Sequence, residues 1–469
     1  MIAGLGPYPA MKDSGVPWLG AVPSDWNVQR IKRLFREKDE RSGDGNGLLL
    51  SLTRARGLLP QAEASNRLAS APDLSKYKVC RPGELVMNRM QAWSGMFAVS
   101  EYEGLVSPDY SVFAATERFE LRFFEQLFKT PLVVDQFAQA SKGVGSGFNR
   151  LYTPEFGAIP VAFPPLPEQA AIVRFLDHAD RRIRRYIGAK QKLIKLLQEQ
   201  KQAIIHRAVT RGLDPNVRLK PSGVEWLGDV PEHWEERPAK WFFREVDERS
   251  ASGDEELLSV SHLTGVTPRS QKSVTMFMAE SYVGHKVCRS GDLVINTMWA
   301  WMAALGVARQ VGLVSPGYGV YRPRRGSPLI GDYADLLLRT RPYVSEYVCR
   351  STGIQSSRLR LYPEQFLRIP VVCPPEAEQR AILESVGSGT AEMAKAIAAA
   401  LREIQLLQEY RTRLIADVVT GKLDVREAAA RLPEDGEEPE SLDVTETLGE
   451  AEEESSPNDL DAEPEEAEA

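Results

Sequence analysis

The segment KVCRPGELVMNRMQAW at residues 78–93 returns, slightly changed, as KVCRSGDLVINTMWAW at residues 286–301. Each copy alternates short apolar runs with Gly and Pro, which is typical of strands joined by tight turns. Further matching pairs flank these segments: GVPWLGAVPSDW (15–26) with GVEWLGDVPEHW (223–234), REKDERS (36–42) with REVDERS (244–250), and GLVSPDYSV (104–112) with GLVSPGYGV (312–320). A register that holds over so long a stretch indicates that one unit occurs twice in the chain.

Both copies close on a Pro-Pro pair and continue into a helical segment. RLYTPEFGAIPVAFPPLPEQAAI (150–172) matches RLYPEQFLRIPVVCPPEAEQRAI (360–382). A proline and an acid in the first turn, as at Pro167 and Glu168, favour a helix start. We therefore expect a mixed α/β fold in five parts: a globular domain at 15–165, a helix at 166–212, a second globular domain at 213–375, a second helix at 376–426, and an acidic tail at 433–469.

Apolar residues recur every three or four positions in both helical segments. The first series is Ile172, Leu176, Ala179, Ile183, Tyr186, Lys190, Leu193, Leu197, Gln200 and Ile204. The second series is Ile382, Val386, Gly389, Met393, Ile397, Ala400, Ile404, Leu407, Arg411, Leu414 and Val418. This near-heptad spacing predicts an antiparallel coiled coil that separates two domains related by a pseudo-twofold axis. The alternative is that each helix packs on its own domain.

The composition, with 43% hydrophobic and 26% charged residues, is that of a globular protein. No segment approaches the roughly 18–20 apolar residues of a membrane span, and the N-terminus lacks the pattern of a secretory signal. The four cysteines, Cys80, Cys288, Cys349 and Cys373, show no CxxC spacing. We therefore expect a cytoplasmic protein.

Charge is unevenly distributed along the chain. Residues 433–469 contain 17 Asp or Glu and no Lys or Arg, which leaves 58 basic against 65 − 17 = 48 acidic residues elsewhere. A basic body suits a polyanionic partner. The composition of the tail predicts disorder. The tail either keeps the chain soluble or competes with nucleic acid for the basic surface.

The order of these motifs resembles the specificity subunits of type I restriction–modification systems. In that family WLG-x-VP-x-x-W precedes each target-recognition domain, and PP-x-x-EQ-x-x-I with a long helix ending near VT-G-K-L-D follows it. Residues 226–231 and 164–169 are especially close to these patterns, and the resemblance covers roughly residues 15–426. The second boundary, at 374–379, departs by lacking LP, and Gly387-Ser388-Gly389 is expected to loosen the start of the second helix.

The resemblance implies an adaptor that recognises DNA without catalysis. Each domain would recognise one half of a bipartite, asymmetric site in double-stranded DNA, and the helices would set the unread spacer and dock two methyltransferase subunits. Restriction subunits that translocate DNA would join for cleavage. The chain itself would need no cofactor, because S-adenosylmethionine, ATP and Mg belong to the partner subunits.

The two copies diverge where a DNA-recognition protein would vary. Residues 53–77 have little in common with 261–285, and 114–149 differ from 322–359. Different surfaces on a common frame predict two different half-sites rather than a palindrome.

Candidate DNA contacts are polar or basic side chains in or beside these segments and in the polar–aromatic segment after the repeated strand. In the first copy they are Arg54, Arg56, Asn88, Arg89, Gln91, Trp93, Lys142, Ser146, Asn149 and Arg150. In the second copy they are His262, Thr264, Arg269, Asn296, Trp299, Trp301, Gln355, Ser356, Arg358 and Arg360.

Structural roles stay open for several of these residues. Trp93 and Trp301 would also suit a core, Asn88 and Asn296 would suit turns, and a loop arginine can be merely solvated. We interpret four other tryptophans and two cysteines as structural: Trp18, Trp26, Trp226, Trp234, Cys80 and Cys288.

Two other classes of function compete with the adaptor. A divergent nuclease would need a carboxylate cluster, which the sequence does not reveal. A coiled-coil scaffold would leave two divergent globular domains unexplained. The chain also lacks the [DNS]PP[FYW] motif of adenine methyltransferases, and GVGSGFNR (143–150) lacks the GK[ST] of a P-loop. The five histidines have no metal-ligand spacing.

Overall fold

A computed structural model describes residues 5–54, 56–64, 73–143, 149–272, 281–353 and 359–433. The described chain divides into two compact units. The first takes the chain as far as Lys190 and again from Arg402, and the second takes Gln191–Leu401. The predicted disorder of the tail concerns residues that lie outside the described ones, except Pro433. Within the described part of the chain, no helix has the length and apolar character needed to cross a membrane.

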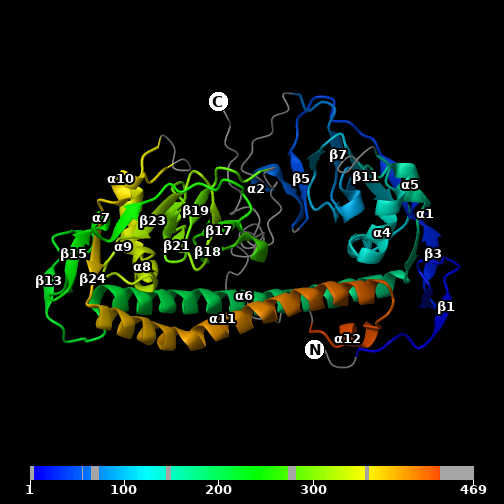
Figure 1. The fold of residues 1–469 in the computed structure, drawn as a ribbon. Helices are drawn as coiled ribbons and strands as arrows, with labels where there is room; N and C mark the ends of the chain where they lie inside the picture. The colour runs from blue at the N-terminus through cyan, green and yellow to red at the C-terminus, as the bar shows by residue number, and fades with distance from the viewer. Residues whose placement is uncertain are drawn as a thin grey trace. The chain divides into compact units, whose positions relative to one another are not determined.

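The first unit is built around a four-stranded antiparallel sheet in the order β4-β11-β8-β9. Figure 1 labels its strand β11. Its strands are β4 (Phe35–Lys38), β11 (Tyr110–Ala115), β8 (Leu85–Asn88) and β9 (Phe97–Val99). Four strand pairs accompany this sheet: β1 (Met11–Asp13) with β2 (Ala21–Pro23), β3 (Asn27–Arg30) with β12 (Pro160–Phe163), β5 (Leu50–Thr53) with β6 (Gly57–Pro60), and β7 (Lys78–Cys80) with β10 (Gly104–Val106). The helices before α6 are α1 (Ile31–Leu34), α2 (Gln61–Ala64), the 3-10 turn η1 (Ala92–Ser94), α3 (Leu121–Phe128), α4 (Pro131–Ala140) and α5 (Thr153–Ala158).

The second unit repeats this topology with the sheet order β16-β23-β20-β21. Its strands are β16 (Phe243–Glu245), β23 (Gly319–Pro323), β20 (Leu293–Ile295) and β21 (Leu305–Val307). The accompanying pairs are β13 (Leu219–Pro221) with β14 (Asp229–Pro231), β15 (Glu235–Pro238) with β24 (Pro370–Cys373), β17 (Leu258–Ser261) with β18 (Gly265–Pro268), and β19 (Lys286–Cys288) with β22 (Gly312–Val314). Its helices are α7 (Ala239–Phe242), η2 (Arg269–Gln271), η3 (Ala300–Met302), α8 (Gly331–Leu338), α9 (Arg341–Arg350) and α10 (Pro363–Phe366). The last helix of the described chain, α12 (Arg426–Ala430), belongs to the first unit.

The two cores use different aromatic residues in the same frame. In the first unit Phe128, Phe137 and Phe156 pack ring against ring with centroids 5.6–5.7 Å apart. In the second unit Tyr347 stands at the place of Phe137 and Tyr333 at that of Phe123, and their hydroxyls require buried acceptors. Tyr333 donates to the carbonyl of Val209 at 2.8 Å, and Tyr347 to that of Leu338 at 2.7 Å.

The residues interpreted as structural lie where the sequence predicts. Trp26 and Trp234 are fully buried, and Trp18 and Trp226 pack half-buried against the two cores. Cys80 and Cys288 are buried in β7 and β19. These predictions are confirmed.

The helices α6 (Leu166–Arg211) and α11 (Glu376–Val419) are each divided between the two units. Within the first unit, Asp180 of α6 pairs with Arg411 of α11, and Lys190 Nζ lies 2.6 Å from Glu403 Oε2. Residue numbers rise along α6 as they fall along α11, so these halves are antiparallel. α11 also runs unbroken through Gly387-Ser388-Gly389, so the expected loosening there is not observed.

The buried face of α6 does not follow the predicted heptad series. Ile187 and Ile194 are buried, whereas Tyr186 and Leu193, which the series placed in the seam, are 56% and 42% exposed. The later buried positions, Ile205 and Ala208, continue the spacing of a straight helix, about 3.6 residues per turn. The predicted series is therefore wrong at Tyr186 and Leu193, whereas its members Lys190, Leu197 and Ile204 are half-buried. The α11 series agrees better, with Thr390 buried in place of Gly389.

Candidate nucleic-acid interface

In each unit a tight turn follows the central strand and is held by an asparagine. The Oδ1 of Asn88 accepts from the Met90 N–H at 3.1 Å, and its Nδ2 donates to Gln91 Oε1 at 3.0 Å. Asn296 repeats the first contact with Met298 at 3.2 Å and donates to the Tyr318 hydroxyl at 3.0 Å. Both asparagines are buried, at 8% and 5% exposure, so their amides serve the turn. A contact with DNA through them stays a prediction.

Tryptophans stand beside these turns. Trp93 is 40% exposed and donates from Nε1 to the Met90 carbonyl at 2.9 Å, so the alternative that it belongs to the core is wrong. Trp301 makes the same bond to Met298 at 2.8 Å but is half-buried. Trp299 stacks on Trp301, with ring centroids 6.3 Å apart and planes at 24°. Flat indole faces at a polar turn are suited to contact bases or sugars.

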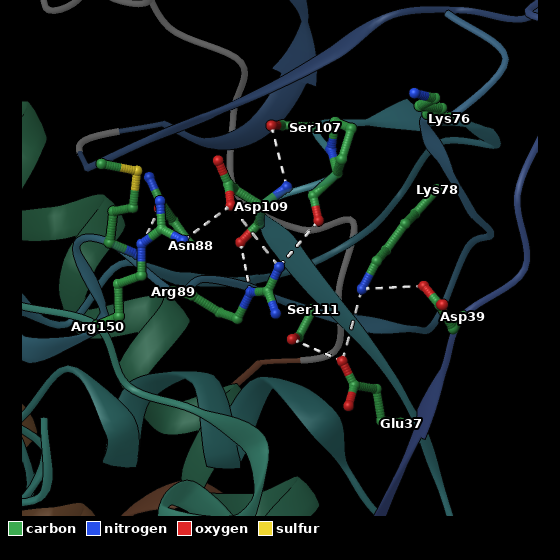
Figure 2. Close-up of polar contacts among 12 residues, drawn as sticks. Glu37, Asp39, Lys76, Lys78, Asn88, Arg89, Ser107, Asp109, Ser111 and Arg150 are labelled. Atoms are coloured by element: carbon green, nitrogen blue, oxygen red, sulfur yellow. Dashed lines mark hydrogen bonds and ion pairs between the residues drawn. The ribbon is translucent and has the colours of Figure 1, made fainter. Parts of the chain in front are cut away.

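Asp109 joins two of the predicted arginines of the first unit (Figure 2). Arg89 donates to the carbonyls of Asp109 at 2.8 Å and Pro108 at 3.0 Å, and its guanidinium lies 3.8 Å from the Asp109 carboxylate. Arg150 approaches the same carboxylate to 3.5 Å. One carboxylate thus offsets the charge of two arginines. Sequence reasoning missed Asp109, although it lies in a repeated motif in which the second copy has Gly317.

The second unit lacks this carboxylate at the equivalent turn. Thr297 replaces Arg89 and donates to the Gly317 carbonyl at 2.7 Å. Arg360, the counterpart of Arg150, reaches the Met298 sulfur at 3.7 Å. Among the described residues no carboxylate pairs with Arg360, so its charge is available to an anion.

A buried lysine lies behind the turn of each unit, and the sequence analysis did not single it out. Lys78 is 3% exposed, and its Nζ lies 3.5 Å from Glu37 and 3.2 Å from Asp39 (Figure 2). A hydrogen bond from Arg41, assisted by Lys78, holds the pKa of Asp39 below its usual value. Lys286 occupies the equivalent place and donates to the Tyr318 carbonyl at 2.8 Å. These buried charges are satisfied internally and belong to the frame.

Hairpins bring the remaining loop candidates near the turns. Arg54 of the β5–β6 hairpin donates to the Ser94 carbonyl at 2.8 Å, and Arg56 donates to the Glu63 carbonyl at 2.6 Å. In the second unit Arg339 donates to the His262 carbonyl. Thr264 Oγ1 lies 2.9 Å from Ser261 Oγ. Leu263, at the tip of this hairpin, is 76% exposed and was missed because an apolar residue carries no polar signal.

The other candidates are less informative. Lys142 pairs with Glu155, while Asn149 and Arg269 are half-buried. Ser146, Gln355, Ser356 and Arg358 lie outside the described residues. Within the described ranges, no group of three or more His, Cys, Asp or Glu is placed to hold a metal ion.

Sequence comparison relates this chain to a specificity subunit of a type I restriction enzyme. No protein-family model matches the chain. The putative type I restriction enzyme MjaX specificity subunit of Methanocaldococcus jannaschii is 20% identical over 236 residues, which cover 46% of this chain and 52% of that protein. The chain therefore matches about half the length of this curated relative.

A solved structure shares the fold of this chain. A chain solved for the complex assembly and conformational transition of the type I R-M system aligns with a TM-score of 0.60 and 16% identity, covering 85% of this chain and 98% of that one. The HsdS subunit from Thermoanaerobacter tengcongensis aligns with a TM-score of 0.42 and 16% identity, covering 86% and 98%. Both kinds of comparison return proteins described as parts of type I systems, which confirms the resemblance found in the sequence.

Proposed function

We propose that this chain is the DNA-specificity subunit of a type I restriction–modification complex, and that it recognises a bipartite, asymmetric site without catalysing a reaction. The observation that carries the proposal is the repeated turn. The same buried asparagine and the same Trp bond to the backbone recur in both units, while the charges around them differ. A constant frame with altered polar groups is the arrangement expected of two domains that recognise different sequences.

Partners are part of the proposal. The antiparallel helices would form a coiled coil that fixes the spacer between half-sites and docks two methyltransferase subunits. Exposed apolar side chains on the helices support docking: Tyr186 and Leu406 of the first unit are 56% and 52% exposed, and Leu196 and Leu401 of the second are both 54% exposed. Restriction subunits would join the same complex in the cytoplasm. S-adenosylmethionine, ATP and Mg would be bound by the partners.

Co-expression with the methyltransferase encoded beside this chain tests the proposal. Adenine methylation is mapped across a genome by single-molecule sequencing, with each protein alone as the control. We expect one motif made of two different half-sites around a fixed gap, methylated only when both proteins are present. Methylation without this chain, or the absence of a gapped motif, would contradict the proposal. Metal-dependent cleavage by the isolated chain would instead support the nuclease alternative.

A further inference from the structure

We propose that Leu263 recognises a thymine by packing on the C5 methyl group of that base in the major groove. The inference deepens the proposed function, on which it rests, by naming a base that the second domain selects. Leu263 stands at the tip of the β17–β18 hairpin and is 76% exposed. Exposure alone assigns no role, because single exposed leucines are common on protein surfaces. The geometry and the place of the hairpin carry the argument.

Hydrogen bonds hold the hairpin tip on both sides of this leucine. Ser261 Oγ accepts from the Thr264 N–H at 3.2 Å and lies 2.9 Å from Thr264 Oγ1. Arg339, which directly follows α8, donates to the His262 carbonyl. Gly265 supplies the positive φ of 67° with which the chain enters β18. The apolar side chain is thus presented by a preorganised backbone, which lowers the entropic cost of a contact with DNA.

The hairpin lies against η3, the turn with the stacked tryptophans. A Cβ atom on Gly265 would be 3.6 Å from the carbonyl oxygen of Leu305, at the start of β21. The Leu305 N–H donates at 2.8 Å to the carbonyl of Ala303, the residue that caps the end of η3. In the first unit the equivalent contact is direct, since Arg54 of the hairpin donates to the Ser94 carbonyl of η1 at 2.8 Å. The tip therefore adjoins the candidate interface of its own unit.

The two units keep this turn and change the side chains that it presents. In the first unit Thr53 Oγ1 accepts from the Arg56 N–H at 3.2 Å, the same bond that Ser261 makes in the second. The first tip has arginines at positions 54 and 56, where the second has His262 and Thr264. A guanidinium suits guanine or phosphate, whereas an apolar tip suits the methyl group that marks thymine in the major groove. The hairpin of the second unit is therefore suited to an A·T pair.

A uracil scan tests the inference. The chain is assembled with its methyltransferase, and the motif mapped by methylation is placed in a fluorescent duplex. Each thymine of the motif is replaced in turn by deoxyuridine, which removes only the C5 methyl group. We expect one position at which this replacement weakens binding about fourfold, the effect of losing one buried methyl-sized group. In the Leu263→Ala variant the same replacement should have no further effect, because the partner of the methyl group is already gone.

Val311→Ala is the matched control, because Val311 is 53% exposed in the same unit but lies outside the hairpin. This variant should keep the uracil effect, and both variants should melt at the wild-type temperature. A motif without a uracil-sensitive thymine, or an equal uracil effect in the wild type and in Leu263→Ala, would overturn the inference. The proposed function has a separate readout, the preference for the motif over a scrambled duplex. Loss of that preference refutes the function and the inference together, whereas a preference without any uracil effect refutes the methyl contact alone.

Discussion

Asp109 offsets two arginines in the first unit, whereas Gly317 leaves Arg360 without a carboxylate partner among the described residues. The substitution Gly317→Asp should therefore weaken DNA binding by about 1 kcal/mol and lower the salt slope by about one. Asp109→Gly should do the opposite. Both effects are measured by anisotropy on a duplex that contains the methylated motif. Gly317→Asn is the control without charge, and equal effects of Asp and Asn at this position would refute the electrostatic explanation.

The cysteines give a second prediction at this scale. Burial raises the pKa of Cys80 and that of Cys288 to about 11, while Cys349 is exposed. At pH 8 the buried thiols remain protonated and shielded from solvent. Maleimide should therefore label Cys349 alone in the native chain and all four cysteines after unfolding, as read by mass spectrometry. Rapid native labelling of Cys80 would contradict the fold described for β7.

Single residues were predictable where both copies agree. The buried tryptophans and cysteines appear twice in one register, so their structural roles follow from the sequence. The role of Asp109 depends on its approach to Arg150, which is far along the chain, and sequence pattern does not report such contacts. For Asn88 and Asn296 the sequence leaves a turn role and a DNA contact as alternatives. Their hydrogen bonds to the backbone of the turn show the first role.

In the long helix α6, two apolar residues are adjacent at positions 186–187. The heptad series chose Tyr186, but the core buries Ile187. The same adjacency recurs at 193–194 and 204–205, so sequence alone offers two registers, and the burial seen in the structure selects one. Ile187→Ala should lower the free energy of unfolding by about 2–4 kcal/mol, whereas Tyr186→Ala should change it by less than about 0.5 kcal/mol. Urea denaturation measures both changes in unfolding free energy. A larger loss for Tyr186→Ala than for Ile187→Ala would support the heptad register instead.

The central sheets balance a buried carboxylate in two different ways. Glu84 of the first unit pairs with Lys38 of β4. Asp292 of the second, 1% exposed, binds Arg322 of β23 at 2.8 Å. Arg322→Ala should destabilise the second unit by about 2–4 kcal/mol, since it leaves Asp292 buried without a countercharge.

The first unit supplies the matched controls for this prediction. Ala114 stands at the position of Arg322, and Val246 at that of Lys38. Adding Val246→Lys to the Arg322→Ala variant should recover much of the lost stability. The new lysine, directly after β16, would supply the countercharge that Asp292 has lost. Thermal unfolding that shows no recovery would indicate that Arg322 acts through packing rather than charge.

For the whole molecule, the internal repeat predicted the mixed α/β class, the duplicated domain and the two long helices, because these follow from periodicity and motif order. The division of each helix between the two units was not predictable, since it depends on which side chains each core buries. The DNA target also lies beyond sequence reasoning, because loop contacts and DNA shape have no transferable code.

The central claim is that each globular domain recognises one half-site. The most direct test replaces residues 228–370 with residues 20–160, so that the first domain occurs twice, and maps methylation in the presence of the methyltransferase. We predict a twofold-symmetric motif in which the half-site of the first domain occurs twice in inverted orientation. An unchanged asymmetric motif from a folded, methyltransferase-bound chimera would contradict the account.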